Sequence, residues 1–102
     1  MAEYDPHDST PQDKSREGKR DAEKLAALAE AEDVRWLMGS KRGRRIVWRL
    51  LSQAGVFQLS FNTNSMTMAF AEGRRNEGLH LFALVNQHSP EHYPVMVKEA
   101  NE

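Results

Sequence analysis

The sequence contains no cysteine among its 102 residues. This absence excludes disulfide bonds, thiolate metal sites and cysteine nucleophiles, and it is compatible with a reducing intracellular environment. No apolar run approaches the roughly 20 residues that a membrane-spanning helix needs, so we expect no membrane span. The N-terminal residues MAEYDPHDST lack both the basic start and the apolar stretch of a secretory signal, and we expect no such signal.

The middle of the chain lacks acidic residues. Residues 34–71 hold six basic side chains and no acidic one, whereas residues 1–33 hold ten acidic and five basic. Residues 72–102 hold five acidic and three basic side chains, so the net charge of −1 hides a strong asymmetry. This layout indicates a middle segment that faces a polyanion, or an acidic tail that folds back over that segment.

The first eighteen residues have almost no aliphatic side chains. Such a segment cannot offset the entropy lost on ordering, so we predict that residues 1–18 form a disordered acidic tail. From about Lys19 the composition changes to strong helix formers. We therefore predict a single helical domain over residues 19–102.

The spacing of apolar residues predicts the first two helices. The first runs from about Lys19 to Met38, with an apolar stripe formed by Leu25, Leu28, Ala29 and Trp36. Gly39 ends it, and Ser40 caps the next helix. The second helix runs from about Lys41 to Ala54, where Gly55 ends it. Its apolar side is predicted to contain Ile46, Val47, Leu50, Leu51 and Ala54, opposite Arg42, Arg45 and Arg49.

The remainder of the chain predicts a loop, a long helix and a short terminal helix. Residues 56–64 form a loop anchored by Phe57 and Phe61, and a helix follows over about residues 65–87. Its predicted interior residues are Met66, Ala69, Phe70, Gly73, Leu81, Leu84 and Val85. A short helix that starts near Pro90 or Pro94 packs Val95, Met96 or Val97. The fold class is all-α, a small bundle of three to four helices.

The segment KRGRRIVWRLL, residues 41–51, carries the main candidate site. Trp48 falls on the flank of the predicted helix, where it can be half buried and can receive Arg44 as a cation-π partner. Three readings remain open: a surface that contacts nucleic-acid phosphates, a surface that binds carboxylates of a partner protein, and a solvated helix face. The candidate contact residues are Lys41, Arg42, Arg44, Arg45, Trp48 and Arg49.

A second group of residues is a candidate for close packing or for an interface. Gly73 and Gly78 each cost ~1 kcal/mol against alanine inside a helix, which indicates a close approach by another helix or by a partner. Glu72, Arg75 and Asn76 form a polar cluster for which an intrahelical network is favoured. The full group is Phe57, Phe61, Gly73, Arg75, Asn76 and Gly78.

No recognisable catalytic or cofactor motif is present. His88 and His92 have the spacing of a helical metal pair, but Pro90 stands between them and a polar turn explains both. A helix-turn-helix would need its recognition helix over residues 58–66, which have no helical stripe. A Ser-His-Asp arrangement and a Gly-rich phosphate loop are also missing. We therefore expect a non-enzymatic protein with no metal and no cofactor.

Several short strings give the chain a recognisable family resemblance. They are RWL from Arg35, GRR from Gly43, WRLL from Trp48, AGVF from Ala54 and EGRRN from Glu72. Over about residues 32–98 the sequence resembles the small tailed-bacteriophage proteins named for a gene product of a Bordetella podovirus, the Bbp19-like phage domain. The resemblance implies genes located among head and connector genes and no established enzymatic role, so no catalytic or ligand-binding residue carries over.

The resemblance also implies a working hypothesis. The protein would be a minor structural component of the virion near the portal or connector, or one ejected with the genome, and would act by binding virion proteins. It would be found in the virion or in the cytoplasm of the infected bacterial host, and several copies in a homo-oligomer remain an open alternative. The alternatives are a DNA-binding accessory protein for packaging or post-entry handling, and a small inhibitor that docks on a host enzyme.

Overall fold

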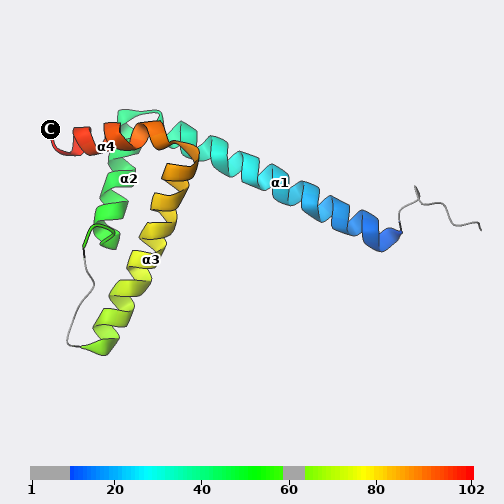
Figure 1. Ribbon diagram of the computed structural model, residues 1–102, viewed down its shortest axis with the longest axis horizontal. Coiled ribbons are helices and arrows are strands. Elements are labelled where there is room, and N and C mark those ends of the chain that lie inside the picture. Colours follow the sequence, from blue (N-terminus) through cyan, green and yellow to red (C-terminus); the bar gives the residue numbers. More distant parts are fainter. Residues whose placement is uncertain (1–9, 59–63) are drawn as a thin grey trace, which may run out of the picture. The chain divides into compact units, whose positions relative to one another are not determined.

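The computed structural model describes residues 10–58 and 64–102 (Figure 1). Within these residues all regular secondary structure is helical: α1 Pro11–Met38, α2 Lys41–Ala54, α3 Ser65–His88, the 3-10 helix η1 Pro90–His92, and α4 Tyr93–Ala100. The prediction of an all-α fold with three to four helices is confirmed. Residues 1–9 of the predicted tail and the predicted anchor Phe61 lie outside the described residues.

The chain divides into two compact units, residues 1–30 and residues 31–102. The hydrophobic core belongs to the second unit, which includes the last two turns of α1. The packed unit therefore begins later than residue 19, where the composition of the chain placed the start of the helical domain.

The start of α1 differs from the sequence-based prediction. Thr10 accepts a hydrogen bond from the Asp13 amide through its hydroxyl oxygen at 3.1 Å and donates to the Asp13 carboxylate at 2.7 Å. Pro11 occupies the first helical position, where its missing N–H costs nothing. The prediction of disorder is wrong for residues 11–18, because this cap and good helix formers support a helix without a core.

Local signals set the bounds of α2 as predicted. The Ser40 hydroxyl accepts a hydrogen bond from the Gly43 amide at 3.0 Å and caps the helix start. Gly55 ends the helix with φ of +76°, a left-handed conformation that glycine adopts without a Cβ penalty. At α3, the Asn64 side chain caps the start by accepting from the Thr67 amide at 3.0 Å.

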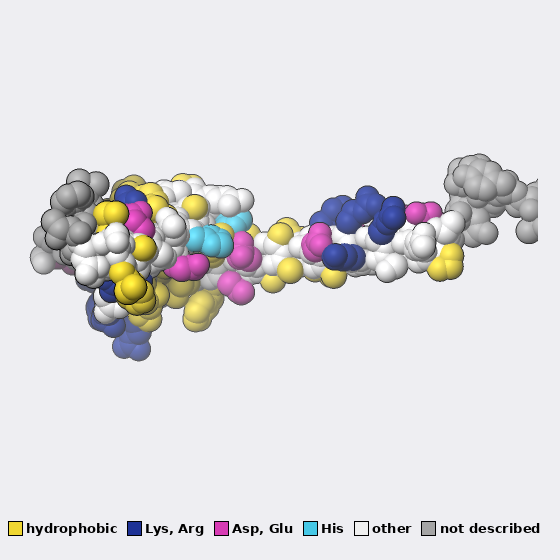
Figure 2. Space-filling model, turned by 90° about the horizontal axis from the view of Figure 1, so that it is seen from below, with side chains coloured by type: hydrophobic (Ala, Val, Ile, Leu, Met, Phe, Trp, Pro, Cys, Tyr) yellow, Lys and Arg dark blue, Asp and Glu magenta, His cyan; other side chains and the backbone are white. Residues whose placement is uncertain are grey.

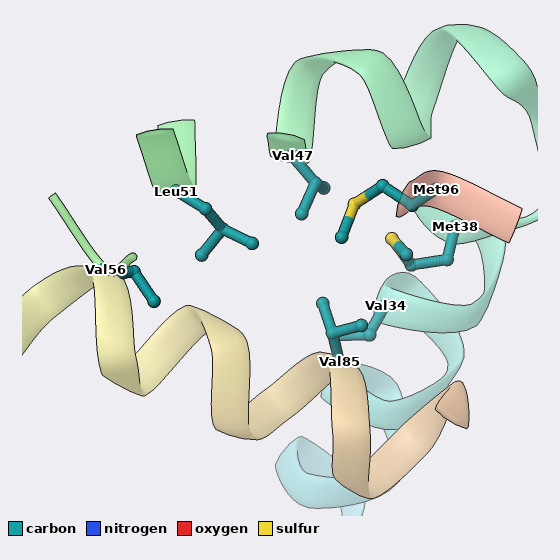
Figure 3. Packing of buried hydrophobic residues seen from close by; sticks show 7 residues of the cluster. All are labelled: Val34, Met38, Val47, Leu51, Val56, Val85 and Met96. Carbon is teal, nitrogen blue, oxygen red and sulfur yellow. The ribbon is translucent and has the colours of Figure 1, made fainter. Parts of the chain in front are cut away.

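In the unit of residues 31–102, α2 and α3 run antiparallel to each other, and α4 lies across them at one end (Figure 1). Their facing side chains enclose a small core to which the last turns of α1 also contribute (Figure 3). The buried core residues are Val34, Met38, Val47, Leu51, Val56, Val85 and Met96. The predicted burial of Val47, Leu51 and Val85 is confirmed. Of the three alternatives predicted for the terminal helix, Val95, Met96 and Val97, Met96 is the buried one.

The apolar stripe predicted for α1 is not the face that packs. Leu25, Leu28 and Trp36 are all exposed, Trp36 at 81%. The buried side of α1 instead contains Ala31, Val34 and Met38. The helix therefore carries two short apolar stripes. The prediction that the stripe with the larger side chains packs against the core is wrong, because the stripe with Val34 and Met38 does so.

Part of the predicted interior of α2 and α3 is also exposed. Ile46 and Leu50 lie at the edge of the buried face of α2. Met66 and Phe70, near the start of α3, are exposed at 81% and 71%. The reason is the length of α3, whose first turns extend beyond the end of α2 (Figure 1). Ala69 and Gly73, also predicted to face the interior, are exposed for the same reason.

The two glycines of α3 behave differently. Gly78 is buried, and a Cβ at this position would lie 2.5 Å from both the Ala54 and the Val56 side chains. The predicted close approach at Gly78 is therefore confirmed. The segment that approaches it is the C-terminal end of α2 and the turn that follows. A Cβ at Gly73 would meet nothing within 4 Å among the described residues, so none of the described elements approaches Gly73 closely.

Candidate functional site

The outer face of α2 presents the predicted row of arginines. Arg42, Arg45 and Arg49 are exposed and follow one another at spacings of one helical turn. The core-facing Val47 and Leu51 hold the opposite side of the helix against α3 and α4. The row is therefore a cationic surface on a well-anchored helix, as its spacing predicted.

Arg44 is not part of this exposed row. Its Nε donates to Glu99 Oε1 at 2.7 Å, and its Nη1 donates to the Met38 carbonyl oxygen at 2.8 Å. The side chains of Arg44 and Glu99 are only 13% and 15% exposed. The Arg44 guanidinium is thus engaged within the chain, where it ties α2 to α4 and to the end of α1, and its contact with a polyanion or a partner stays a prediction.

Lys41 also has a partner within the chain. Its Nζ lies 3.2 Å from Glu102 Oε2, and both side chains are more than half exposed. An exposed pair of this kind contributes little to stability, so Lys41 remains accessible to an external anion.

Trp48 is half buried, as predicted, but its neighbour is aromatic rather than cationic. Its ring stacks on Phe57 with centroids 5.1 Å apart and an interplanar angle of 27°. The row continues edge to face from Phe57 to Phe82 at 6.3 Å and from Phe82 to Tyr93 at 5.3 Å. Since Arg44 turns to Glu99, the predicted cation-π pair with Trp48 is replaced by this aromatic row.

The aromatic row links α2, the turn after it, α3 and α4. The sequence reading missed Phe82 and Tyr93. Phe82 follows Gly78 by four residues and precedes Val85 by three, so the buried face of α3 was a signal that could have found it. Phe57, which is 47% exposed, anchors the turn as predicted and leaves part of its ring at the surface.

A small pocket opens between α2 and α4. Its volume is about 60 Å³. The lining residues are Lys41, Arg44, Arg45, Trp48, Met96, Glu99 and Ala100. Four of the six candidate contact residues of α2 therefore meet at one place, together with a wall from α4 that the sequence did not indicate.

The remaining candidates of the interface group are spread along α3. Arg75 Nε donates to the Gln58 carbonyl oxygen at 3.1 Å, which ties α3 to the turn after α2 rather than to neighbours on its own helix. Asn76 is exposed. Near the start of α3, the Arg74 guanidinium lies 5.5 Å from the centre of the exposed Phe70 ring.

Exposed apolar side chains are numerous for so small a unit. On the face shown in Figure 2, hydrophobic side chains of residues 31–102 lie among Lys and Arg side chains. The most exposed large ones are Trp36, Met66 and Phe70, with Ile46, Leu50 and Phe57 about half exposed.

The structure gives no support to a metal site at His88 and His92. His92 Nδ1 lies 2.7 Å from the Ser89 hydroxyl and 3.4 Å from a Glu91 carboxylate oxygen, in the polar turn that starts η1. Across residues 10–58 and 64–102, no group of three or more His, Cys, Asp or Glu side chains is arranged to hold a metal ion. In the same ranges, no helix has the length and apolar character needed to cross a membrane.

Comparison with known proteins identifies a family. A family model described as Bbp19-like phage protein matches residues 34–98, which is more than half of the chain. No curated protein and no solved structure matches the chain significantly. The matched range contains all seven residues of the buried core cluster, from Val34 to Met96, so it covers the packed part of the fold. The resemblance is confirmed, and the chain belongs to the family of Bbp19-like phage proteins.

Proposed function

We propose that the protein is a non-enzymatic minor component of the phage virion that acts by binding other virion proteins. Its place is near the portal or connector, or among the proteins ejected with the genome. The observation that supports this proposal is the exposure of Met66 and Phe70, at 81% and 71%, on the first turns of α3. Exposed apolar patches on small proteins mark interaction surfaces.

The physical argument rests on what these side chains gain in a complex. Burial of a Met or Phe side chain contributes about 1.5–3 kcal/mol, which this chain leaves unused at both positions. Gly73 lies within one turn of Phe70 and has open space around it, so a partner helix can approach the α3 backbone closely there. Large anchors beside a small residue suit a protein partner better than a phosphate backbone.

The test is mass spectrometry of purified virions that carry either the parent protein or the variant Phe70→Asp. We expect the parent protein in intact virions and a loss of about tenfold or more for Phe70→Asp, because a buried anchor is worth at least ~1.4 kcal/mol at an interface. Ala83→Asp is the matched control, since it places the same charge at an exposed position of the same helix. This control should be incorporated like the parent.

Particles that have released their genome separate the two locations. A connector component stays with the emptied particle, whereas an ejected component is lost with the DNA. Absence of the parent protein from intact virions would refute the proposal, as would equal incorporation of the Phe70→Asp and parent proteins.

A second candidate function is DNA binding during packaging or after entry. It is favoured by the exposure of Arg42, Arg45 and Arg49, none of which forms an ion pair within the described residues. Three phosphate contacts would release counterions and make the affinity depend on salt with a slope of about −2.7 in logarithmic terms.

Fluorescence anisotropy with a labelled random-sequence duplex tests this function. If DNA is bound, the variant Arg42→Glu, Arg45→Glu, Arg49→Glu should lose both the binding and the salt slope. The control Lys14→Glu, Arg16→Glu, Lys19→Glu makes the same change in net charge on exposed residues of α1 and should keep the slope within about one. No binding at low salt, or equal losses in the two variants, would reject an α2 DNA site.

A further inference from the structure

The pocket between α2 and α4 combines apolar and cationic surface in a graded way. Met96 is buried and Trp48 is half buried, so part of the deeper lining is apolar, and it lies beside the largely buried ion pair of Arg44 and Glu99. Lys41 and Arg45 are exposed and line the same pocket, so the charges lie nearer to its mouth. A ligand that fits must therefore carry a small apolar group flanked by negative charge.

The size of the pocket restricts the apolar group. A volume of about 60 Å³ is several times the roughly 10–15 Å³ that one water molecule needs. It is smaller than the ~150 Å³ apolar cavity known to hold a benzene ring. A short branched aliphatic side chain suits this space better than an aromatic ring or a nucleobase does.

The charges around the pocket favour a carboxylate as the bound anion. The chain places its own carboxylates on two of the lining cations, Glu99 on Arg44 and Glu102 on Lys41. Arg45 lines the pocket and forms no ion pair within the described residues. The Lys41 to Glu102 pair is exposed, so a carboxylate from outside can replace Glu102 at small cost.

We propose that this pocket binds an acidic segment of a partner protein, which inserts one branched aliphatic side chain beside Trp48 and Met96. A carboxylate next to that side chain pairs with Arg45, and a second carboxylate competes with Glu102 for Lys41. The inference rests on the proposed protein-binding function and names the partner class for one site. That site is separate from the Phe70 surface.

Arginine explains the preference for a carboxylate at this position. Its planar fork can bind both oxygens of a carboxylate, and the nearby apolar surface lowers the competition from water. The small aliphatic group adds selectivity, because a polyanion that lacks such a group cannot fill the apolar part of the pocket. Nucleic acids offer phosphates and aromatic bases. The cations of the pocket can pair with the phosphates, but the pocket is too small to hold a base.

The experiment is an NMR titration of the isotope-labelled full chain with two capped peptides, acetyl-Glu-Leu-Glu-amide and acetyl-Glu-Ala-Glu-amide. The leucine peptide should shift the NMR signals of the Trp48 indole N–H and of the backbone amides of Met96 and Ala100. We expect a Kd of about 1 mM. The alanine peptide should bind about fivefold more weakly or less, because it leaves the apolar part of the pocket unfilled.

Three variants assign the effect to the pocket. Ala100→Phe adds a ring at an exposed lining position and should remove the difference between the two peptides. Arg45→Glu should weaken both peptides by about fivefold or more. Arg35→Glu is the matched control, since it makes the same charge change at an exposed residue that does not line the pocket, and it should change the affinity by less than about twofold.

Three results would overturn the proposal. These are equal affinity for the two peptides, no shift of pocket amides at about 10 mM leucine peptide, and stronger shifts of the same amides by an oligothymidylate. The last result would assign the pocket to nucleic acid. None of them bears on whether the protein is present in virions, so failure of this proposal and failure of the proposed function are distinguishable.

Discussion

Replacing Gly43 with alanine is expected to destabilise the protein by about 3 kcal/mol, at the upper end of the range for overpacking. Gly43 is buried in the first turn of α2. A Cβ there would overlap the carbonyl oxygen of Leu37, and it would lie 2.8 Å from the Leu37 carbonyl carbon and 3.0 Å from the Ser40 hydroxyl oxygen. Backbone atoms cannot rotate away as a flexible side chain does, so the turn between α1 and α2 must open.

The cost is large because several contacts depend on that turn. Ser40 caps α2 through the Gly43 amide, and Met38, directly before the turn, is fully buried in the core. Alanine has a better helix propensity than glycine by about 1 kcal/mol, and the backbone overlap outweighs this gain.

Urea unfolding followed by tryptophan fluorescence measures the effect of Gly43→Ala. Gly73→Ala is the matched control: it adds the same Cβ to an exposed helical glycine with nothing within 4 Å. The control should stabilise the protein by up to about 1 kcal/mol. A Gly43→Ala protein as stable as the parent would contradict the close approach of α2 to the end of α1.

Replacing Arg44 with methionine is expected to destabilise the protein by about 2–3 kcal/mol. The substitution leaves the Glu99 carboxylate, which is 15% exposed, without its 2.7 Å partner and the Met38 carbonyl without its donor. Removing one member of a fully buried pair costs about 3–5 kcal/mol, and the remaining exposure of this pair reduces the figure. Methionine retains most of the apolar stem of arginine, so the stability lost in Arg44→Met reflects the loss of the charged guanidinium rather than of packing.

A double-mutant cycle tests this expectation. Adding Glu99→Leu to Arg44→Met should restore most of the lost stability, because no unpaired carboxylate then remains at the α4 wall. Lys41→Met breaks the exposed pair with Glu102 and should cost less than about 1 kcal/mol. If Arg44→Met costs no more than Lys41→Met, the largely buried pair of Arg44 and Glu99 does not hold α2 to α4.

The outcome affects how charge-reversal experiments are interpreted. Arg44 lies within the basic segment 41–51, and loss of its ion pair with Glu99 would weaken any binding through the fold, whether or not Arg44 contacts the ligand. Variants that test the α2 surface must therefore change Arg42, Arg45 and Arg49, and leave Arg44 in place.

The helices themselves were largely predictable from local sequence. Ser40 and Gly55 bound α2 where the sequence placed its ends, and the arginine row follows directly from the helical spacing. The signal that was overlooked was also local: Thr10, Pro11 and Asp13 form a start for α1. Helix caps and helix propensities depend on residues within a few positions of each other, so the sequence alone contains the information that sets the helix bounds.

Which faces would be buried was less predictable. Periodicity showed that Met66 and Phe70 share a face of α3, but not that α2 ends too early to cover them. On α1, the stripe with Trp36 has the larger side chains, yet the stripe with Val34 and Met38 meets the core. A pattern identifies residues that lie together, whereas burial requires a partner surface that the pattern does not contain.

The sequence by itself determined the all-α class, the cationic face of α2 and the family to which the chain belongs. Only the tertiary structure decided that Arg44 is engaged by Glu99, which is 55 residues away in the chain, and that α4 completes a pocket beside Trp48. The physical reason is the range of the interactions. Helix formation depends on neighbours within one or two turns, whereas an ion pair or a pocket depends on where distant segments meet in space.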